Sequence, residues 1–402
     1  MGRKKKVSNL NIKTLDFQKH IEGSPLEELS YNVDGRPYVK WGRDNNMPEL
    51  LLDLYNQSPT HSSAIRFAVN VIVGGGIDYD AMKLNGSDIT PNYKYSYDDL
   101  LRYIALDYVI FGTFALQIIK NKDGKTYTYY HCPMANVRYS EYDDDGTIQG
   151  YYICSDWTET GVNPPIYVKS FVQNSERIKV GEPYLYVYHN YNPVTKYYPV
   201  PTYNSALKAI QTECQIINFD LKTTINGFVP SGMLVLNDYE TEEEKQAVVR
   251  EIQKMFVGTE NANSLMITFR NNVEDNVPEF VPFTTNASNY NLYSDSDART
   301  RVRILAAHRI SDAALCGLPS IGATGFASEA DKLKTALAVY ERLVGTNNRN
   351  VIIGALNFLF STNGIEQELI LKPFSFDIEE QVQVTRSEDN GEEDVRITEE
   401  EA

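Results

Sequence analysis

The chain has 402 residues, of which 42% are hydrophobic and 11% aromatic, and its formal net charge is −16. Such a chain is long and apolar enough for two or more structural units with sizeable cores, so we expect an ordered composite body and not a short peptide or a repeat array. The acidic balance argues against a free-standing nucleic-acid-binding domain, which normally presents a net basic face, but it permits a protein past which DNA moves without being held tightly.

Charge is concentrated at the two ends of the sequence. The run Arg3-Lys4-Lys5-Lys6 predicts a flexible basic arm over residues 1–40, and Lys6 stands where a myristoylation signal has Ser or Thr. Between Asp377 and Glu401 there are eleven acidic residues and two arginines, which supply −9 of the net charge. We therefore expect residues 374–402 to form a solvated, disordered acidic tail, and the rest of the chain is only mildly acidic.

The cysteines and the hydropathy indicate an intracellular, non-membrane protein. Cys132, Cys154, Cys214 and Cys316 are scattered and form no CxxC pair, which predicts free thiols in a reducing cytoplasm. No apolar run is long enough for a transmembrane helix, and no charged-then-apolar leader precedes the body.

Residues 41–200 have the pattern of helices followed by strands. Apolar spacing predicts a short helix through Tyr55 with Pro48 in its first turn, a second helix over 62–73 and a third over 97–111. Strands follow, with Asp123-Gly124 and the 143–146 run as hairpin turns. The predicted strands cover 114–119, 127–130, 137–139, 151–153, 166–168 and 184–188. This order favours an α+β fold with an antiparallel sheet.

Two long helices and a small β/α unit are predicted after Pro201. The first helix runs from Tyr203 to Gly227 and is stopped by the Gly and Pro residues up to Gly232. Strands at 233–236, 265–269 and 280–283, with an amphipathic helix from Thr241 to Phe256, then form the small unit. The sequence therefore predicts a protrusion at the end of a helical stalk.

A long helix, a glycine-rich loop and a second helix make up the next part of the chain. Ser294-Asp295-Ser296-Asp297 supplies capping oxygens and negative charge for a helix start, and the apolar spacing continues to Cys316. Gly317-Leu318-Pro319 ends that helix. A loop of small residues follows, and a second helix begins at Ser328 with Glu329.

No motif for catalysis, metal binding or cofactor binding is found. Gly124-Lys125-Thr126 lacks the first glycine of a P-loop, because position 119 is Ile, and it lies in a predicted hairpin turn. His131, Cys132 and Cys154 match no zinc-site spacing, and no nucleophile elbow is present. We therefore predict no catalytic residue, no metal and no cofactor. A cytoplasmic carboxylate-dependent hydrolase built on the tyrosine-rich sheet remains the alternative from another class.

The basic residues around the glycine-rich loop permit two interpretations. The first group belongs to the long helix and contains Arg299, Arg301, Arg303, His308 and Arg309. The second group follows the loop and contains Lys332 and Lys334. The first group either lies on a channel wall near phosphates or pairs with acids of a neighbouring helix or subunit, and mixed charge on a long helix favours the pairing. The two lysines are the better candidates for facing DNA.

The order of these parts resembles that of tailed-bacteriophage (Caudovirales-type) portal proteins. The resemblance spans residues 45–360 and rests on the succession of four short pieces. These are Asn46-Met47-Pro48-Glu49-Leu50, Ser58-Pro59-Thr60 through Ile65, Asn226-Gly227-Phe228-Val229-Pro230-Ser231-Gly232, and Ala306-Ala307-His308-Arg309-Ile310 through Pro319.

The resemblance implies a structural protein without enzymatic activity. A portal forms a ring, typically of twelve subunits, at one capsid vertex, assembled in the host cytoplasm. Double-stranded DNA passes through it without specific recognition. Terminase, a head-tail connector or adaptor, and the major capsid protein are the other expected partners. A channel through which DNA slides cannot hold many phosphates tightly, which suits an acidic chain with few free cations.

The resemblance also assigns a part to each range of the sequence. Residues 41–200 are expected to form the wing, 201–232 the first stem helix, 233–293 the clip, 294–316 the second stem helix, 317–328 the tunnel loop and 329–373 wing or short crown helices. The tunnel-loop residues expected to face the DNA channel, with the two lysines that follow, are Ser320, Gly322, Ala323, Thr324, Gly325, Phe326, Lys332 and Lys334.

Overall fold

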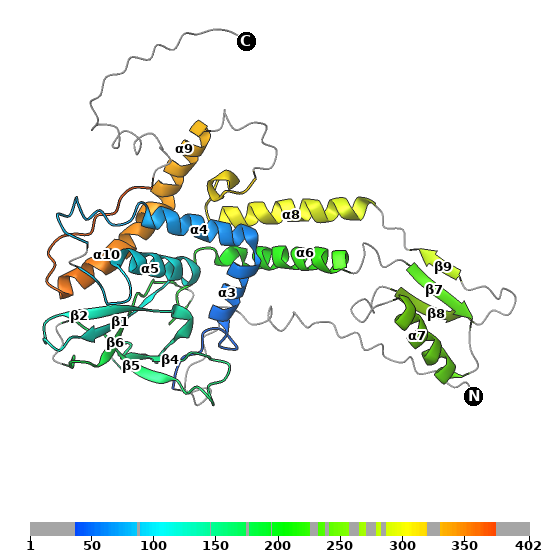
Figure 1. Cartoon of the computed structure of the whole chain (residues 1–402), viewed down its shortest axis with the longest axis horizontal. Helices are drawn as coiled ribbons and strands as arrows, with labels where there is room; N and C mark the ends of the chain where they lie inside the picture. Colours follow the sequence, from blue (N-terminus) through cyan, green and yellow to red (C-terminus); the bar gives the residue numbers. More distant parts are fainter. Residues whose placement is uncertain are drawn as a thin grey trace, which may run out of the picture.

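The computed structural model describes residues 37–374, apart from 87–88, 145, 174–176, 194, 226–231, 238–240, 257–264, 271–278, 283–286 and 320–329. The described residues form an α+β fold with one six-stranded and one three-stranded sheet, which confirms the predicted fold class. The six-stranded sheet and most helices form one body, and two helices extend from it toward the three-stranded sheet (Figure 1). None of the described helices has the length and apolar character needed to cross a bilayer.

Three helices, α3 (Met47–Gln57), α4 (Pro59–Val73) and α5 (Tyr97–Phe111), begin the body. Ser58 caps α4 by accepting from His61 N at 3.2 Å, and Pro59 follows in the first turn, where a missing N–H costs nothing. Ser96 starts α5 with a capping box, and Gly112 ends it in the left-handed region. The predicted bounds of α5 are confirmed. Because of its cap, α4 starts three residues earlier than predicted.

The large sheet has the strand order β2-β1-β6-β5-β4-β3. Its strands are β1 (Ala115–Lys120), β2 (Tyr127–Cys132), β3 (Val137–Tyr139), β4 (Gly150–Ile153), β5 (Ile166–Ser170) and β6 (Pro183–Val187). The pairs β1–β2 and β3–β4 are antiparallel, which confirms both predicted hairpins. The strands β5 and β6 pair in parallel, so the expectation of an antiparallel sheet is wrong there. The long 171–182 connection allows this crossover.

Helices α5 and α10 (Thr346–Thr362) lie over one face of this sheet (Figure 1). The hydroxyl of Tyr129 on β2 donates to Leu359 O on α10 at 2.9 Å, and the ring of Tyr186 on β6 stacks on Phe358 at 5.1 Å. One continuous apolar cluster includes residues of the sheet and of helices α3, α4, α5, α6, α8, α9 and α10. The tyrosines therefore join the sheet to the helical layer through both their rings and their hydroxyls.

Residues 37–40, predicted as the end of the N-terminal arm, belong to the body. Tyr38 and Val39 are buried, Val39 N donates to Tyr139 O at 2.9 Å, and Tyr198 Oη donates to Val39 O. The arm prediction is therefore wrong over these residues, because the segment pairs with the sheet. The remainder of the arm, residues 1–36, lies outside the described residues.

Helices α6 (Leu207–Ile225) and α8 (Ala287–Ala307) run side by side and project from the body (Figure 1). A short 3-10 turn, η2 (Asn204–Ala206), leads into α6, so the helix predicted from Tyr203 begins later. The helix predicted over 294–316 is wrong at both ends. It starts seven residues earlier, with Asp297 inside the helix as the ion-pair partner of Arg301 at 3.4 Å. It ends at Ala307, and residues 313–316 form a separate 3-10 turn, η3 (Ala313–Cys316).

A small βαβ unit lies at the far end of the helix pair (Figure 1). It contains β7 (Gly232–Asn237), α7 (Glu242–Phe256), β8 (Leu265–Arg270) and β9 (Glu279–Pro282). The order is β8-β7-β9, with β8 parallel and β9 antiparallel to the central strand. Thr241 Oγ1 accepts from Glu244 N at 3.3 Å at the start of α7. The predicted β/α unit is confirmed at the level of its elements.

The last helices form one rod with a π-helical turn inside it. Helix α9 (Ala330–Tyr340) continues through η4 (Glu341–Gly345) into α10. Arg349 donates to Val71 O and Ile72 O at the end of α4, and a Cβ on Gly345 would lie 2.8 Å from Val71 Cγ1. The π turn thus lies where the rod crosses closely over α4. Residues 375–402 are outside the described part of the chain.

Candidate functional site

A buried polar cluster joins α4 to the two projecting helices, α6 and α8. We call it the junction cluster, and its members are Ser58, Thr60 and His61 of α4, Tyr203 before η2, Glu213 of α6 and His308 after α8. Ser58 Oγ donates to Glu213 Oε2, and Thr60 Oγ1 donates to Glu213 Oε1 at 2.5 Å. His61 Nδ1 lies 2.9 Å from His308 Nε2. The first turn of α4 therefore binds both projecting helices.

The two histidines of the junction cluster are held in the neutral form. Desolvation by burial and the neighbouring His308 lower the pKa of His61 to about 2, and burial lowers the pKa of His308 to about 4. One ring nitrogen of the 2.9 Å pair donates and the other accepts, which two neutral imidazoles can do. The ring of Tyr203 packs on both, at 4.5 and 5.0 Å between centroids, and burial raises its pKa. The pair therefore acts as a packed, uncharged link.

The junction cluster leaves no room for a substrate. Glu213 is 4% exposed, and the cavity beside His308 has a volume of about 20 Å³. Such a volume holds about one water molecule. Within the described residues, no group of three or more His, Cys, Asp or Glu side chains is arranged to hold a metal ion. The arrangement is suited to fixing helices in place.

Helix α8 ends at a residue with an unusual backbone conformation. Arg309 has φ 58°, in the left-handed region that favours glycine. Ile310 N donates to Leu305 O at 2.9 Å, which closes a Schellman-type end, and Asp312 then accepts from Ala314 N at 2.9 Å to start η3. An arginine at this position costs about 1 kcal/mol. The chain turns here from α8 toward the segment 320–329.

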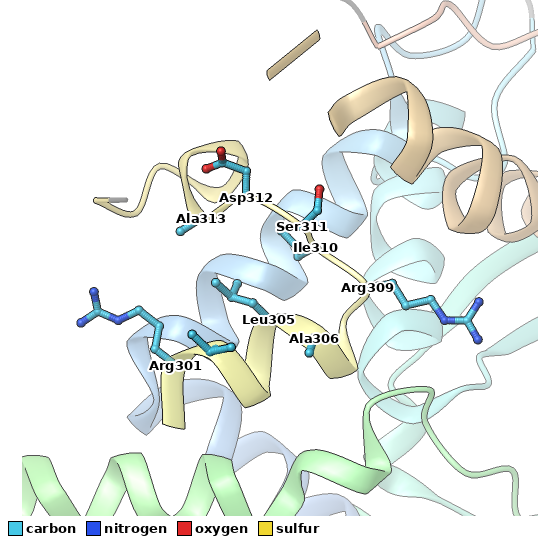
Figure 2. A pocket seen from close by; sticks show the side chains of 9 residues that line it. Arg301, Leu305, Ala306, Arg309, Ile310, Ser311, Asp312 and Ala313 are labelled. Atoms are coloured by element: carbon cyan, nitrogen blue, oxygen red, sulfur yellow. The ribbon is translucent and has the colours of Figure 1, made fainter. Parts of the chain in front are cut away.

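An open groove lies along the end of α8 and the turn that follows it (Figure 2). Its volume is about 570 Å³, and it is lined by Arg301, Val302, Leu305, Ala306, Arg309, Ile310, Ser311, Asp312 and Ala313. Figure 2 shows the side chains of Arg301 and Arg309 extending in opposite directions from the two ends of the groove. Arg301 pairs with Asp297 one turn earlier on the same helix. Arg309 makes no ion pair with any residue that the structure describes.

A second groove lies between α8 and α6 and shares Ala306 with the first. It has a volume of about 530 Å³ and is lined by Ser205, Ala206, Lys208, Ala209, Thr212, Arg303, Ala306 and Ala307. Both charged residues of this lining, Lys208 and Arg303, are cationic and exposed. We call it the α6–α8 groove. Of the predicted basic residues, Arg301 and Arg309 thus line one groove and Arg303 lines the other, and the two grooves meet at Ala306.

The other predicted site residues that the structure describes line neither of these two grooves. Arg299 is exposed on α8, whereas His308 is buried in the junction cluster, apart from the four arginines. Lys332 and Lys334 are exposed on α9, and Lys332 lines a shallow groove with Ser311. The predicted loop residues lie outside the described part of the chain: Ser320, Gly322, Ala323, Thr324, Gly325 and Phe326. Their assignment to a DNA channel stays a prediction.

Among known proteins, the likeness of this chain is to solved structures, and it is a likeness of fold. No protein-family model matches the sequence, and no curated protein matches it either. A chain of the neck of an empty GTA particle, computed with C6 symmetry, superposes with a TM-score of 0.51 over 82% of this chain and 84% of that chain, at 14% identity.

Two further structures come from the same kind of particle. A chain of the virion of a native gene transfer agent (GTA) particle and a chain of the neck of a native GTA particle, computed with C12 symmetry, each give a TM-score of 0.46 at 14% identity. They cover 84% and 83% of this chain and 86% of each of those chains.

Proposed function

We propose that this protein is a phage portal subunit, which assembles into a ring at one capsid vertex and serves as the conduit for DNA packaging and ejection. The fold shared with a chain of a GTA neck supports this proposal, because that particle is phage-like and its neck has rotational symmetry. In this proposal the ring has about twelve subunits, the chain has no catalytic activity, and the terminase, the head-tail connector and the capsid protein dock on it.

The observation that carries the proposal is the projecting helix pair and the large apolar side chains that it exposes to solvent. Helices α6 and α8 leave a broad α+β body and lead to a small βαβ unit. In this proposal the body is the wing, the two helices are the stem and the βαβ unit is the clip. The exposed fraction of Leu221 on α6 is 56%, and that of Val302 on α8 is 58%. Large apolar side chains along a projecting helix pair suit packing against the same pair of a neighbouring subunit.

In such a ring, the junction cluster would fix the orientation of the stem helices relative to the body. Each subunit must hold its stem at a fixed angle to its wing, or the ring cannot close. The contacts of Glu213 with α4 and of His308 with His61 fix that angle inside one subunit. The turn at Arg309 then directs the chain from the stem into the 317–328 segment, which is the tunnel loop in this proposal.

Electron microscopy of the purified full-length protein tests the proposal. We expect closed rings with a central hole, of uniform subunit number by native mass spectrometry. A compact particle that stays monomeric at the highest soluble concentration would overturn the proposal. A hydrolytic activity abolished by one Asp or Glu substitution, in a protein that never forms rings, would support the alternative of a carboxylate-dependent hydrolase.

A further inference from the structure

The α6–α8 groove has the chemistry of a binding site for an acidic peptide. It is lined by the small side chains of Ala206, Ala209, Ala306 and Ala307 and by the exposed hydroxyl residues Ser205 and Thr212. Lys208 and Arg303 add positive charge from the two helices, and no acidic residue lines the groove. A lining of small apolar side chains with one cation from each helix accommodates an extended chain whose carboxylates reach those cations.

The two cations of the groove are unsatisfied within the subunit. Among the described residues, neither Lys208 nor Arg303 has an ion-pair partner. Other arginines do have one: Arg301 pairs with Asp297, and Arg349 lies 3.6 Å from Glu341. The neighbouring carboxylate on α6, Glu213, is buried and already accepts from Ser58 and Thr60. The positive charge in the groove is therefore available to an anion from elsewhere.

We propose that the acidic C-terminal segment, residues 377–401, occupies the α6–α8 groove of its own chain and pairs there with Lys208 and Arg303. With eleven acidic residues and two arginines, it is the most acidic stretch of the sequence and complements the groove in charge. The proposal goes beyond the portal function and does not depend on it, because both the groove and the segment belong to one chain.

The end of the described chain lies within reach of the groove. The ring of Phe374 contacts that of Phe67 on α4 at 6.4 Å between centroids, and His61 of the same helix contacts His308 after α8. Six residues of helix separate Phe67 from His61, which is about 9 Å. Residues 375–402 can span up to about 90 Å when extended. The tether also makes the association intramolecular, which raises the local concentration of the segment far above that of a free ligand.

The dimensions of the groove favour a peptide over duplex DNA. Packed helices lie about 8–10 Å apart, so a groove between two of them admits side chains and single extended strands. A DNA duplex is wider than this spacing and could touch only the rim. Each copy of the chain also carries its own acidic segment on a tether, whereas DNA must come from solution. Phosphates of DNA are nevertheless the competing anion, and the experiment includes them.

Site-specific photo-crosslinking in the full-length protein tests the proposal. A photo-crosslinking amino acid replaces Thr212 at the groove rim, and a control protein carries it in place of Lys169, which is exposed on β5. At about 50 mM salt we expect the crosslinks from position 212, but not those from position 169, to map to residues 375–402. Raising the salt to about 1 M, where the Debye length is about 3 Å, should reduce the yield at least fivefold.

Charge variants and isotope labelling complete the test. The double variant Lys208→Gln with Arg303→Gln should lose the crosslink at least fivefold, whereas Lys169→Gln should keep it, and circular dichroism confirms that both remain folded. When isotope-labelled and unlabelled protein are mixed, the two peptides of each crosslinked pair should both be labelled or both be unlabelled. This is the result expected for contact within one chain. The proposal is overturned by mixed-isotope peptides, by crosslinks to added DNA instead of 375–402, or by a yield that neither salt nor the double variant changes.

Discussion

His61 Nδ1 lies 2.9 Å from His308 Nε2, and this contact joins the first turn of α4 to the residue that follows α8. The two residues are separated by 247 positions in the sequence and are both buried. Burial lowers the pKa of both imidazoles, so the pair is neutral at physiological pH. The connection between the body and the projecting helices therefore depends on an uncharged histidine pair, and protonation works against it.

We predict that stability falls as the pH drops below about 6.5. The unfolded chain binds protons on both histidines near their ordinary pKa of 6.5, whereas the folded chain does so only near 4 for His308 and near 2 for His61. Because the unfolded state binds more protons in this window, the free energy of unfolding decreases by up to about 1.4 kcal/mol per pH unit for each histidine. Urea unfolding at pH 7.5 and 5.5 measures the decrease, expected to be about 2 to 3 kcal/mol.

A double variant isolates the contribution of the pair. His61→Gln with His308→Gln removes both titrating groups, so most of the difference between pH 7.5 and 5.5 should disappear even if the variant is less stable at both. The protein concentration is held constant, because self-association would itself change the apparent stability. An unchanged pH dependence in the double variant would assign the effect to other groups.

Glu213→Ala should lower the free energy of unfolding by about 3 kcal/mol. The substitution removes two hydrogen bonds to a carboxylate and leaves the buried hydroxyls of Ser58 and Thr60 without their acceptor. Gln215→Ala is the matched control, since it lies on the same helix and is exposed, and its effect should stay within about 0.5 kcal/mol. Chemical denaturation measures both. Equal effects of the two substitutions would show that Glu213 does not stabilise the junction cluster.

Arg309→Gly should leave the stability unchanged or raise it by about 1 kcal/mol, because glycine adopts a φ of 58° without the steric cost that arginine carries. Arg303→Gly is the control: the same chemical change inside α8 should cost about 1 kcal/mol. Thermal unfolding of the two variants gives shifts of different sign if the structure at the helix end is correct. A loss of stability in Arg309→Gly would instead mean that the arginine side chain makes a stabilising contact.

Local signals in the sequence were sufficient for most of the fold. The bounds of α5 follow from the Ser96 capping box and Gly112, and both hairpins follow from their Asp-Gly turns. The end of α8 could not be predicted, because an arginine in the left-handed region has no sequence signature and the apolar spacing continues past it. The start of α8 could not be predicted either, because an acidic residue can cap a helix or form an ion pair inside it. Asp297 forms such a pair with Arg301, one turn later in the helix.

The junction cluster could not be predicted for a related reason. Glu213 lies next to the apolar positions of α6, where a glutamate normally points to solvent. Its hydroxyl partners are 153 and 155 residues away, and no local pattern indicates such pairing. The sequence places His308 among the arginines of α8, because the spacing of charged residues does not show which face of a helix packs against the protein core. The structure separates it from them by burial.

The last prediction concerns the exposed apolar side chains of the projecting helices. Leu221→Asp and Val302→Asp each place a charge where, in the proposed ring, a neighbouring subunit would cover the position. A charge buried without a partner in an interface is strongly destabilising, so we expect ring formation to be lost or to require at least tenfold more protein. Because both positions are solvent-exposed within the subunit, each variant should keep its circular dichroism spectrum.

Val172→Asp provides the control, since Val172 is 61% exposed but lies on the body, between β5 and β6. It makes the same chemical change at similar exposure away from the helix pair. Sedimentation velocity of the three variants and the unaltered protein should therefore separate Leu221→Asp and Val302→Asp from the other two. If all three variants form rings as the unaltered protein does, α6 and α8 do not provide the subunit contact. If only Val172→Asp fails, the contact includes the connection between β5 and β6.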